Sequence, residues 1–240
     1  MPEHCLWDRG GQHGKDRSRH CQYSPPTFAR MQFGHFEHYS PGDLTGVATY
    51  PGWTVTPIVA GTLVMLDRVG GWIQLLPAAV EDQGVQMQSD GEMFLPAANR
   101  DIHFGIRIES LDVTENDIFV GLSITNGTLI TAPAADLIGF WTHDGDANLD
   151  FQCQATAQAA GAVDTGVNLA DNTAIELGFF VNGITSVHSY INGVEDTTAQ
   201  VNVAAQIPIT ELALSFAVLT GEIAANDLKI DWYSIVQNYV

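Results

Sequence analysis

Basic residues are scarce in this chain. Nine Lys and Arg stand against 28 Asp and Glu, which gives a formal net charge of −19. Binding to nucleic acid or to an anionic membrane surface depends on basic patches that attract phosphate groups. We therefore expect that the protein binds neither nucleic acid nor membrane.

The sequence also lacks a long apolar run and a cysteine framework. No stretch approaches the roughly 20 apolar residues of a transmembrane helix, and the N-terminus has no apolar segment typical of a signal peptide. The three cysteines, Cys5, Cys21 and Cys153, are too few and of odd number for a disulfide scaffold. Reduced thiols and synthesis in the cytoplasm are expected.

Helical periodicity is missing as well, since no window of helical length carries an apolar stripe with a period of 3.6 residues. Instead, short runs rich in Val, Ile, Phe and Thr recur between Gly, Asn and Asp. In DIHFGIRIESL, for example, Ile102, Phe104, Ile106 and Ile108 alternate with more polar residues, as in a half-buried strand. Residues 33–240 are therefore predicted to form one all-β antiparallel sandwich or barrel.

The first 32 residues have a different character, because they are polar, aperiodic and rich in His and Arg. Residues 1–30 hold five basic and three acidic residues, whereas the remainder holds four and 25. We predict an extended N-terminal arm, residues 1–32, that binds an acidic protein surface. Aromatic residues and Arg usually dominate interface energy, so the candidate partner-binding residues are Trp7, Arg9, Arg17, Arg19, Tyr23, Phe28 and Arg30.

The stretch FWTHDGDANLDFQCQ combines acidic residues with strand-like flanks. Asp144, Asp146 and Asn148 match the first three ligand positions of an EF-hand loop, but Leu149 and Ala155 replace its Gly and its bidentate Glu. We predict a hairpin turn at Asp144-Gly145 with no bound metal, and a cation site of another kind within 144–150 stays an alternative. A second hairpin is predicted at Asn192-Gly193, because both residue types tolerate positive φ.

Catalytic patterns are weak. Glu109, Asp112 and Glu115 form the best candidate for a glycosidase carboxylate pair, but Glu109 and Asp112 would point to opposite faces of a strand. The His and Cys residues of the arm match no compact zinc spacing, and no nucleophile elbow or phosphate-binding glycine loop is present. We predict a protein without enzymatic activity or cofactor.

The isolated histidines and most tryptophans have structural interpretations. His143 and His188 each stand alone in a strand context. Four tryptophans lie within or beside apolar runs, where core packing is expected: Trp53, Trp72, Trp141 and Trp232.

The order of several segments resembles a group of tailed-bacteriophage virion proteins. These segments are DIFVGLSIT, IGFWTHDGDANLDFQCQ, TAIELGFFVNG, SYINGV and LKIDWYSIV, within residues 33–240. The resemblance implies a concanavalin-like (lectin-like) jelly-roll β-sandwich that serves as a head decoration, or cement, protein. It also implies a location on the capsid exterior, binding to the major capsid protein and to neighbouring decoration subunits, and assembly as a homotrimer.

Two further expectations accompany this resemblance. The apolar C-terminus, with Ile235, Val236, Tyr239 and Val240, would be exposed in an isolated subunit and so favours oligomerisation. A glycan-binding, lectin-like virion module for adhesion to a receptor or host surface is the alternative function, because one sandwich fold carries unrelated functions.

Overall fold

The computed structural model describes residues 29–35, 42–43, 49–50, 52–132, 135–156 and 161–238, with the backbone alone for the first three segments and for residue 161. Within these residues the chain forms β-strands and one short 3-10 helix, η2 (Ala204–Gln206). All strand pairs are antiparallel, and the strands make two stacked sheets. The predicted all-β sandwich is confirmed.

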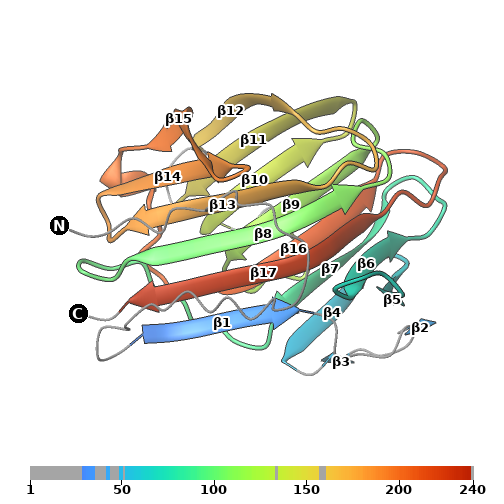
Figure 1. The fold of residues 1–240 in the computed structure, drawn as a ribbon, viewed down its shortest axis with the longest axis horizontal. Helices are drawn as coiled ribbons and strands as arrows, with labels where there is room; N and C mark the ends of the chain where they lie inside the picture. Colours follow the sequence, from blue (N-terminus) through green and yellow to red (C-terminus); the bar gives the residue numbers. More distant parts are fainter. Residues whose placement is uncertain are drawn as a thin grey trace, which may run out of the picture.

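Sheet A lies in front of sheet B in Figure 1. Its strands, in spatial order, are β15 (Val194–Val201), β14 (Ser186–Ile191), β13 (Ile175–Asn182), β8 (Ile102–Ser110), β17 (Leu228–Asn238), β6 (Trp72–Pro77), β5 (Gly61–Leu66) and β2 (Gly42–Asp43). β1 (Ala29–His35) pairs with the C-terminal part of β17, beyond the residues that pair with β6.

Sheet B carries the candidate site on its outer face. Its strands, in spatial order, are β12 (Gly161–Asn168), β11 (Asp146–Gln154), β10 (Leu137–His143), β9 (Asn116–Ser123), β16 (Ala213–Thr220), β7 (Gln83–Ser89), β4 (Trp53–Ile58) and β3 (Thr49–Tyr50). Strands that are distant in sequence, such as β9 and β16, are therefore neighbours in this sheet.

The main core lies between the two sheets. The four alternating residues of β8, Ile102, Phe104, Ile106 and Ile108, all point into it and are at most 5% exposed. Phe104 stacks on the ring of Phe179 with a centroid separation of 4.6 Å. Complete burial of one such side chain stabilises the fold by about 1.5–3 kcal/mol, so the alternation predicted from the sequence directs packing.

Both predicted hairpins are confirmed. In the first, His143 pairs with Asp146, so Asp144-Gly145 is a two-residue loop between β10 and β11. Gly145 has a φ of +81°, which a residue with a Cβ rarely adopts. In the second, Asn192 and Gly193 both have positive φ between β14 and β15, as a type I′ turn requires.

Two expectations from the sequence change in the structure. β1 begins at Ala29, so residues 29–32, which were assigned to the arm, lie in sheet A, and Arg30 is opposite Gln237. Ile235, which was expected to be exposed in one subunit, is fully buried in the core, because every second residue of β17 points inward. Ile235 therefore gives no support for oligomerisation.

The tryptophans divide between two environments. Trp53 packs in the main core against Tyr233, with a centroid separation of 5.5 Å. Trp72 is also buried, but it lies on the outer side of β6 beneath the guanidinium groups of Arg68 and Arg107, which are 4.5 and 5.4 Å from its ring. Trp232 is half-buried. Core packing therefore holds for Trp53 and not for Trp72.

Candidate functional site

A hollow of about 280 Å³ opens on the outer face of sheet B. Its lining comes from three neighbouring strands, from β16 and from the loop after β9: Asp117, Ile130, Thr131, Trp141, His143, Gln152 and Leu219. The strand register explains this gathering, since Trp141 lies between Phe119 of β9 and Asp150 of β11. Cross-strand partners share a face, so Asp150 points to the same outer surface.

Trp141 is part of a second, smaller hydrophobic cluster on this outer face, with Phe119, Leu129, Leu137 and Ala217. Its ring packs 4.9 Å from that of Phe119, and only 2% of Trp141 is exposed. The indole Nε1 nevertheless has no hydrogen-bond acceptor among the described residues. A buried donor without an acceptor is uncommon in proteins.

His143 and Asp117 form the polar side of the hollow. His143 Nδ1 lies 3.8 Å from Asp117 Oδ1, and the same oxygen accepts a hydrogen bond of 2.9 Å from the backbone N–H of Asp144. Burial raises the pKa of Asp117, and the nearby carboxylates of Asp144 and Asp82 act in the same direction. These effects outweigh the hydrogen bond and His143, which favour the ionised form.

Asp150 also interacts electrostatically with His143. Burial raises the pKa of its carboxyl, the neighbouring Asp164 and Asp146 add to this increase, and His143 opposes it. The outer face of sheet B thus combines an aromatic ring, an imidazole and several carboxylates. Side chains of these types bind hydroxyl-rich ligands by stacking and by hydrogen bonds.

The wall of the hollow is formed by the loop between β9 and β10. Gln86 Oε1 accepts a hydrogen bond of 2.9 Å from the backbone N–H of Leu129, and Gln88 Oε1 accepts one of 3.0 Å from that of Asn126. Both glutamines belong to β7, so the loop lies across the middle of sheet B. It leaves the part over β10 and β11 open, where Ile130 and Thr131 line the hollow.

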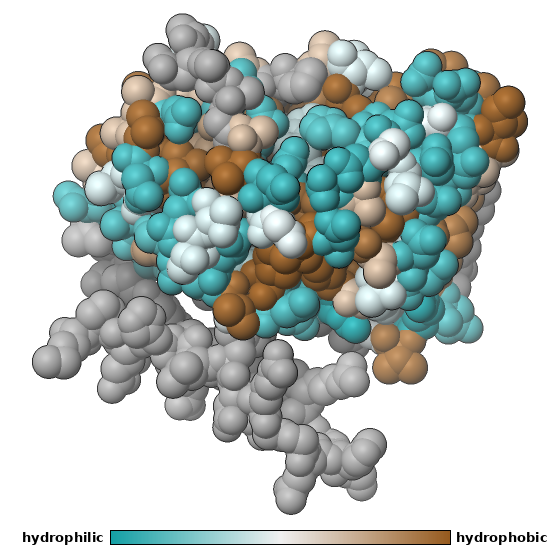
Figure 2. Space-filling model, turned by 90° about the horizontal axis from the view of Figure 1, so that it is seen from above, coloured by the Kyte–Doolittle hydropathy of each residue, from teal (hydrophilic) through white to brown (hydrophobic). Residues whose placement is uncertain are grey.

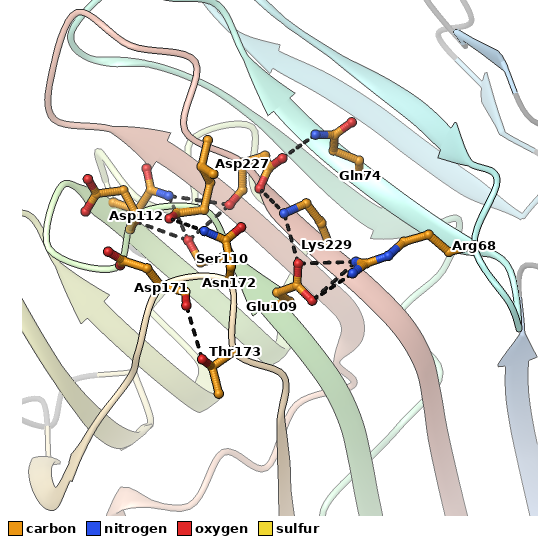
Figure 3. Close-up of polar contacts among 12 residues, drawn as sticks. Arg68, Gln74, Glu109, Ser110, Asp112, Asp171, Asn172, Thr173, Asp227 and Lys229 are labelled. Atoms are coloured by element: carbon orange, nitrogen blue, oxygen red, sulfur yellow. Dashed lines mark hydrogen bonds and ion pairs between the residues drawn. The ribbon is translucent and has the colours of Figure 1, made fainter.

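A different polar cluster lies at the opposite sheet, as Figure 3 shows. Glu109 accepts hydrogen bonds of 3.2 Å from Arg68 and of 3.1 Å from Lys229. Lys229 also lies 3.2 Å from Asp227 Oδ1, and the other oxygen of Asp227 accepts a hydrogen bond from Gln74. Burial by itself would raise the pKa of Glu109, but the hydrogen bonds from Arg68 and Lys229 hold it below its ordinary value.

The acidic residues at the end of β8 have local partners in this arrangement. Glu109 is paired with two cations, Arg68 from the loop after β5 and Lys229 of β17. Asp112 Oδ1 instead accepts hydrogen bonds from the backbone N–H groups of Thr114 and Glu115 within the next loop. Both carboxylates are therefore engaged in holding local structure.

The binding role of the predicted arm residues stays a prediction. Trp7, Arg9, Arg17, Arg19, Tyr23 and Phe28 lie outside the described residues, and only the backbone of Arg30 is described. Sequence reasoning did not identify the hollow. The available signal was that Trp141 and His143 have the same parity on one strand, but their partners Asp117 and Gln152 come from other strands.

The described residues also bear on metal and thiol chemistry. Among them, no group of three or more His, Cys, Asp or Glu side chains is arranged to hold a metal ion. Burial raises the pKa of the Cys153 thiol to about 12, so this thiol does not serve as a nucleophile at neutral pH. No helix within the described ranges has the length and apolar character needed to span a membrane.

Comparison with solved structures identifies the fold. The chain is similar to an endo-1,3-β-glucanase from Streptomyces sioyaensis (TM-score 0.62, 8% identity, 90% of this chain and 99% of that chain). It is also similar to a protein of unknown function from Shewanella oneidensis (TM-score 0.60, 11% identity, 88% and 87%). Peanut lectin matches with a TM-score of 0.55 and 13% identity over 89% of this chain and 99% of that chain.

Sequence comparisons give no family, because no family model and no curated protein matches the chain. At these low identities the structural matches establish the fold alone. The protein has the concanavalin-like jelly-roll sandwich that lectins share with some carbohydrate-active enzymes. The predicted fold class is therefore confirmed.

Proposed function

We propose that this protein is a lectin-like module that binds carbohydrate in the hollow on the outer face of sheet B. The observation that carries the proposal is the convergence of the Trp141 indole, the Asp117 carboxylate and the Gln152 amide on one open hollow. Ligand sites commonly combine an apolar floor with a few polar groups that fix orientation. Lectins and a glucanase share this fold, which supports the choice of ligand class.

Binding without hydrolysis is the activity proposed. A glycosidase needs two carboxyl groups on opposite sides of the scissile bond, about 5–9.5 Å apart. Here Asp117 is held by the backbone N–H of Asp144 and faces His143. Asp150 stands two strands away, beyond Trp141. The contacts of Asp117 support a role for this carboxylate in the shape and charge of the site.

An immobilised panel of defined oligosaccharides tests the proposal. We expect the full chain to bind a subset of them, and His143→Ala to weaken binding at least fivefold without a change in fold, because 60% of this side chain is exposed. His103→Ala is the matched control, since His103 is exposed on sheet A and stacks on Phe180.

Two results would contradict the proposal. One is a wild-type protein that binds no oligosaccharide of the panel, and the other is equal binding by the His143 and His103 variants. Incubated oligosaccharides should also stay intact by mass spectrometry, and their cleavage would replace the binding function by an enzymatic one.

Decoration of a phage head is the second candidate function, and one end of the sandwich favours it. We define the loop end as loops 59–60, 78–82, 111–115, 144–145, 169–174, 192–193 and 221–227, most of which lie toward the right of Figure 1. Backbone hydrogen bonds join these loops, for example from Gly145 N–H to the Thr114 carbonyl and from Gly221 N–H to the Glu115 carbonyl. The loop end is therefore a connected surface.

Its side chains are of two kinds. Exposed apolar side chains lie in or beside these loops: Val59, Val80, Leu111, Val194 and Ile223. Acidic residues accompany them, and none of these loops contains Lys, Arg or His. Figure 2 shows hydrophobic side chains among hydrophilic ones at the right-hand end of the molecule. Apolar residues rimmed by charges often mark protein interaction sites, and an acidic surface attracts a basic partner.

Under this candidate function the arm anchors the protein on the capsid exterior, and neighbouring subunits assemble as a trimer. Linked copies would strengthen individually weak contacts with the major capsid protein. The test is deletion of residues 1–28, which leaves β1 intact, together with Trp7→Ala in the full chain. We expect lower occupancy on purified phage heads and lower heat resistance of those heads.

Sedimentation of the isolated protein over a concentration series checks the trimer separately. A truncated protein that decorates heads as fully as the intact one would remove the arm from the interface. A monomer at all concentrations would remove the trimer.

A further inference from the structure

The geometry points to an uncharged sugar residue as the ligand of the hollow, with the Trp141 indole N–H as a donor to one of its oxygen atoms. This inference rests on the proposed glycan-binding function and adds the class of sugar to it. It follows from the unsatisfied indole donor, from the charges around the hollow and from its size.

The Trp141 indole supplies an unpaired hydrogen-bond donor at the hollow. Trp141 lines the hollow, and only 2% of its surface is exposed. Its Nε1 has no hydrogen-bond acceptor among the described residues. Leaving a buried donor unpaired is unfavourable. A hydroxyl or ring oxygen of a sugar in the hollow would supply the missing acceptor, whereas an aliphatic ligand would not.

The charged side chains around the hollow are mainly carboxylates. Asp117 is in the lining of the hollow. On the same outer face, Asp150 is opposite Trp141 on the neighbouring strand, and Asp164 is opposite Asp150 on the strand after that. None of the described residues that line the hollow is Lys or Arg. A sugar carboxylate or sulfate would therefore meet like charges, and His143, the basic side chain of the lining, already faces Asp117. Such a juxtaposition of like charges is a strong means of rejecting a ligand.

The hydrogen-bonding groups and the size of the hollow suit a single sugar residue. An ionised Asp117 accepts hydrogen bonds only, so it suits sugar hydroxyl donors, and the exposed Thr131 hydroxyl adds both a donor and an acceptor. The volume of about 280 Å³ is just below the range of about 300–1,000 Å³ that is usual for small-molecule pockets. One sugar residue at the end of a glycan is therefore the unit recognised.

The experiment compares sugars that differ only in charge. Methyl β-glucoside and methyl β-galactoside are titrated into the full chain by calorimetry or NMR, next to methyl β-glucuronide and methyl β-galacturonide. We expect at least one neutral glycoside to bind at least tenfold more tightly than its uronide. The difference should shrink as the salt concentration rises, because exposed charges are screened.

Two variants examine the two causes separately. Trp141→Phe keeps an aromatic ring and removes the N–H, so it should weaken binding of the neutral glycoside about tenfold, whereas Trp72→Phe, on sheet A, is the control. Asp164→Asn removes one exposed carboxylate near the hollow and should reduce the preference for the neutral glycoside over its uronide about twofold to fivefold. Because Asp164 is exposed, this variant tests the charge argument even if Trp141→Phe does not fold.

The possible failures are distinguishable. Uronides that bind as tightly as the neutral glycosides would overturn the sugar class and leave the glycan-binding function in place. Undiminished binding by a folded Trp141→Phe variant would overturn the role of the indole N–H. If neither these glycosides nor the oligosaccharide panel bind at all, the proposed function itself is wrong.

Discussion

The rings of Trp141 and His143 lie nearly parallel, with an interplanar angle of 14° and centroids 5.8 Å apart. Both residues belong to β10 and project from the outer face of sheet B, so the imidazole extends the aromatic surface from a buried position toward solvent. Because 60% of the His143 side chain is exposed, this pair links the apolar cluster under the loop to the open hollow.

The charge of Asp117 should reduce stability at neutral pH. Burial raises the folded-state pKa of this carboxyl above its ordinary value of 3.8. Its contribution is therefore favourable below that value and is lost as the pH rises through the raised pKa. At pH 7, Asp117→Asn should unfold at a higher urea concentration than the wild type. Its free energy of unfolding should be higher by less than about 1 kcal/mol.

The two proteins should converge in stability near pH 3. The Asn side chain still accepts the hydrogen bond from the Asp144 N–H, so the difference measures charge alone. Equal stability at pH 7 would show that the environment of Asp117 does not penalise its ionised form.

Glu109 should stabilise the protein in a pH-dependent manner of the opposite sign. Its folded-state pKa is depressed below the ordinary value of 4.5 by Arg68 and Lys229. The stabilisation is complete above that value and is lost as the pH falls through the depressed pKa. We expect Glu109→Gln to cost about 2 kcal/mol at pH 7 and less at pH 2, measured by urea unfolding.

Glu81→Gln is the control for this variant, since Glu81 is exposed and its replacement removes the same charge. If both variants lose the same stability, the effect of Glu109 comes from net charge and not from its ion pairs.

Gly145 should be required by backbone conformation alone. A Cβ at this position would contact nothing within 4 Å, but its φ is +81°. Gly145→Ala should therefore lower the free energy of unfolding by about 1 kcal/mol. Gly127→Ala should leave the free energy of unfolding nearly unchanged. A Cβ at Gly127 also contacts nothing within 4 Å, and this residue has no positive φ.

At Gly221 the limit on a larger side chain is space and not backbone conformation. A Cβ at this position would overlap the carboxylate of Asp144, so Gly221→Ala must displace that side chain. A double-mutant cycle with Asp144→Ala provides the measurement. The cost of Gly221→Ala should be smaller in the Asp144→Ala background, and identical costs in both backgrounds would show that the two residues do not interact.

The hairpin at Asp144-Gly145 should be independent of metal ions. Its geometry follows from the positive φ of Gly145, and the Asp146 Oδ1 oxygen accepts a hydrogen bond of 2.9 Å from the Asn148 N–H. Addition of a chelator should leave the melting temperature unchanged within error. A decrease of several degrees would instead place a cation in this loop.

The sequence by itself determined the local features of this protein. Alternation along β8 fixed which residues face the core, because adjacent side chains of a strand point to opposite faces. Asp144-Gly145 and Asn192-Gly193 indicated hairpins, because positive φ is a property of a few residue types. These features depend on neighbours in the chain, and the structure confirms them.

Only the tertiary structure decided which distant residues meet. Asp117, Trp141 and Gln152 reach one hollow through the register of β9, β10 and β11, and Glu109 finds Lys229 120 positions away in the chain. Pairing between strands is set by the packing of the whole sandwich, and a shift of one residue would reverse every side chain of a strand. The same packing buried Ile235 and placed Trp72 under two guanidinium groups, neither of which the local sequence pattern indicates.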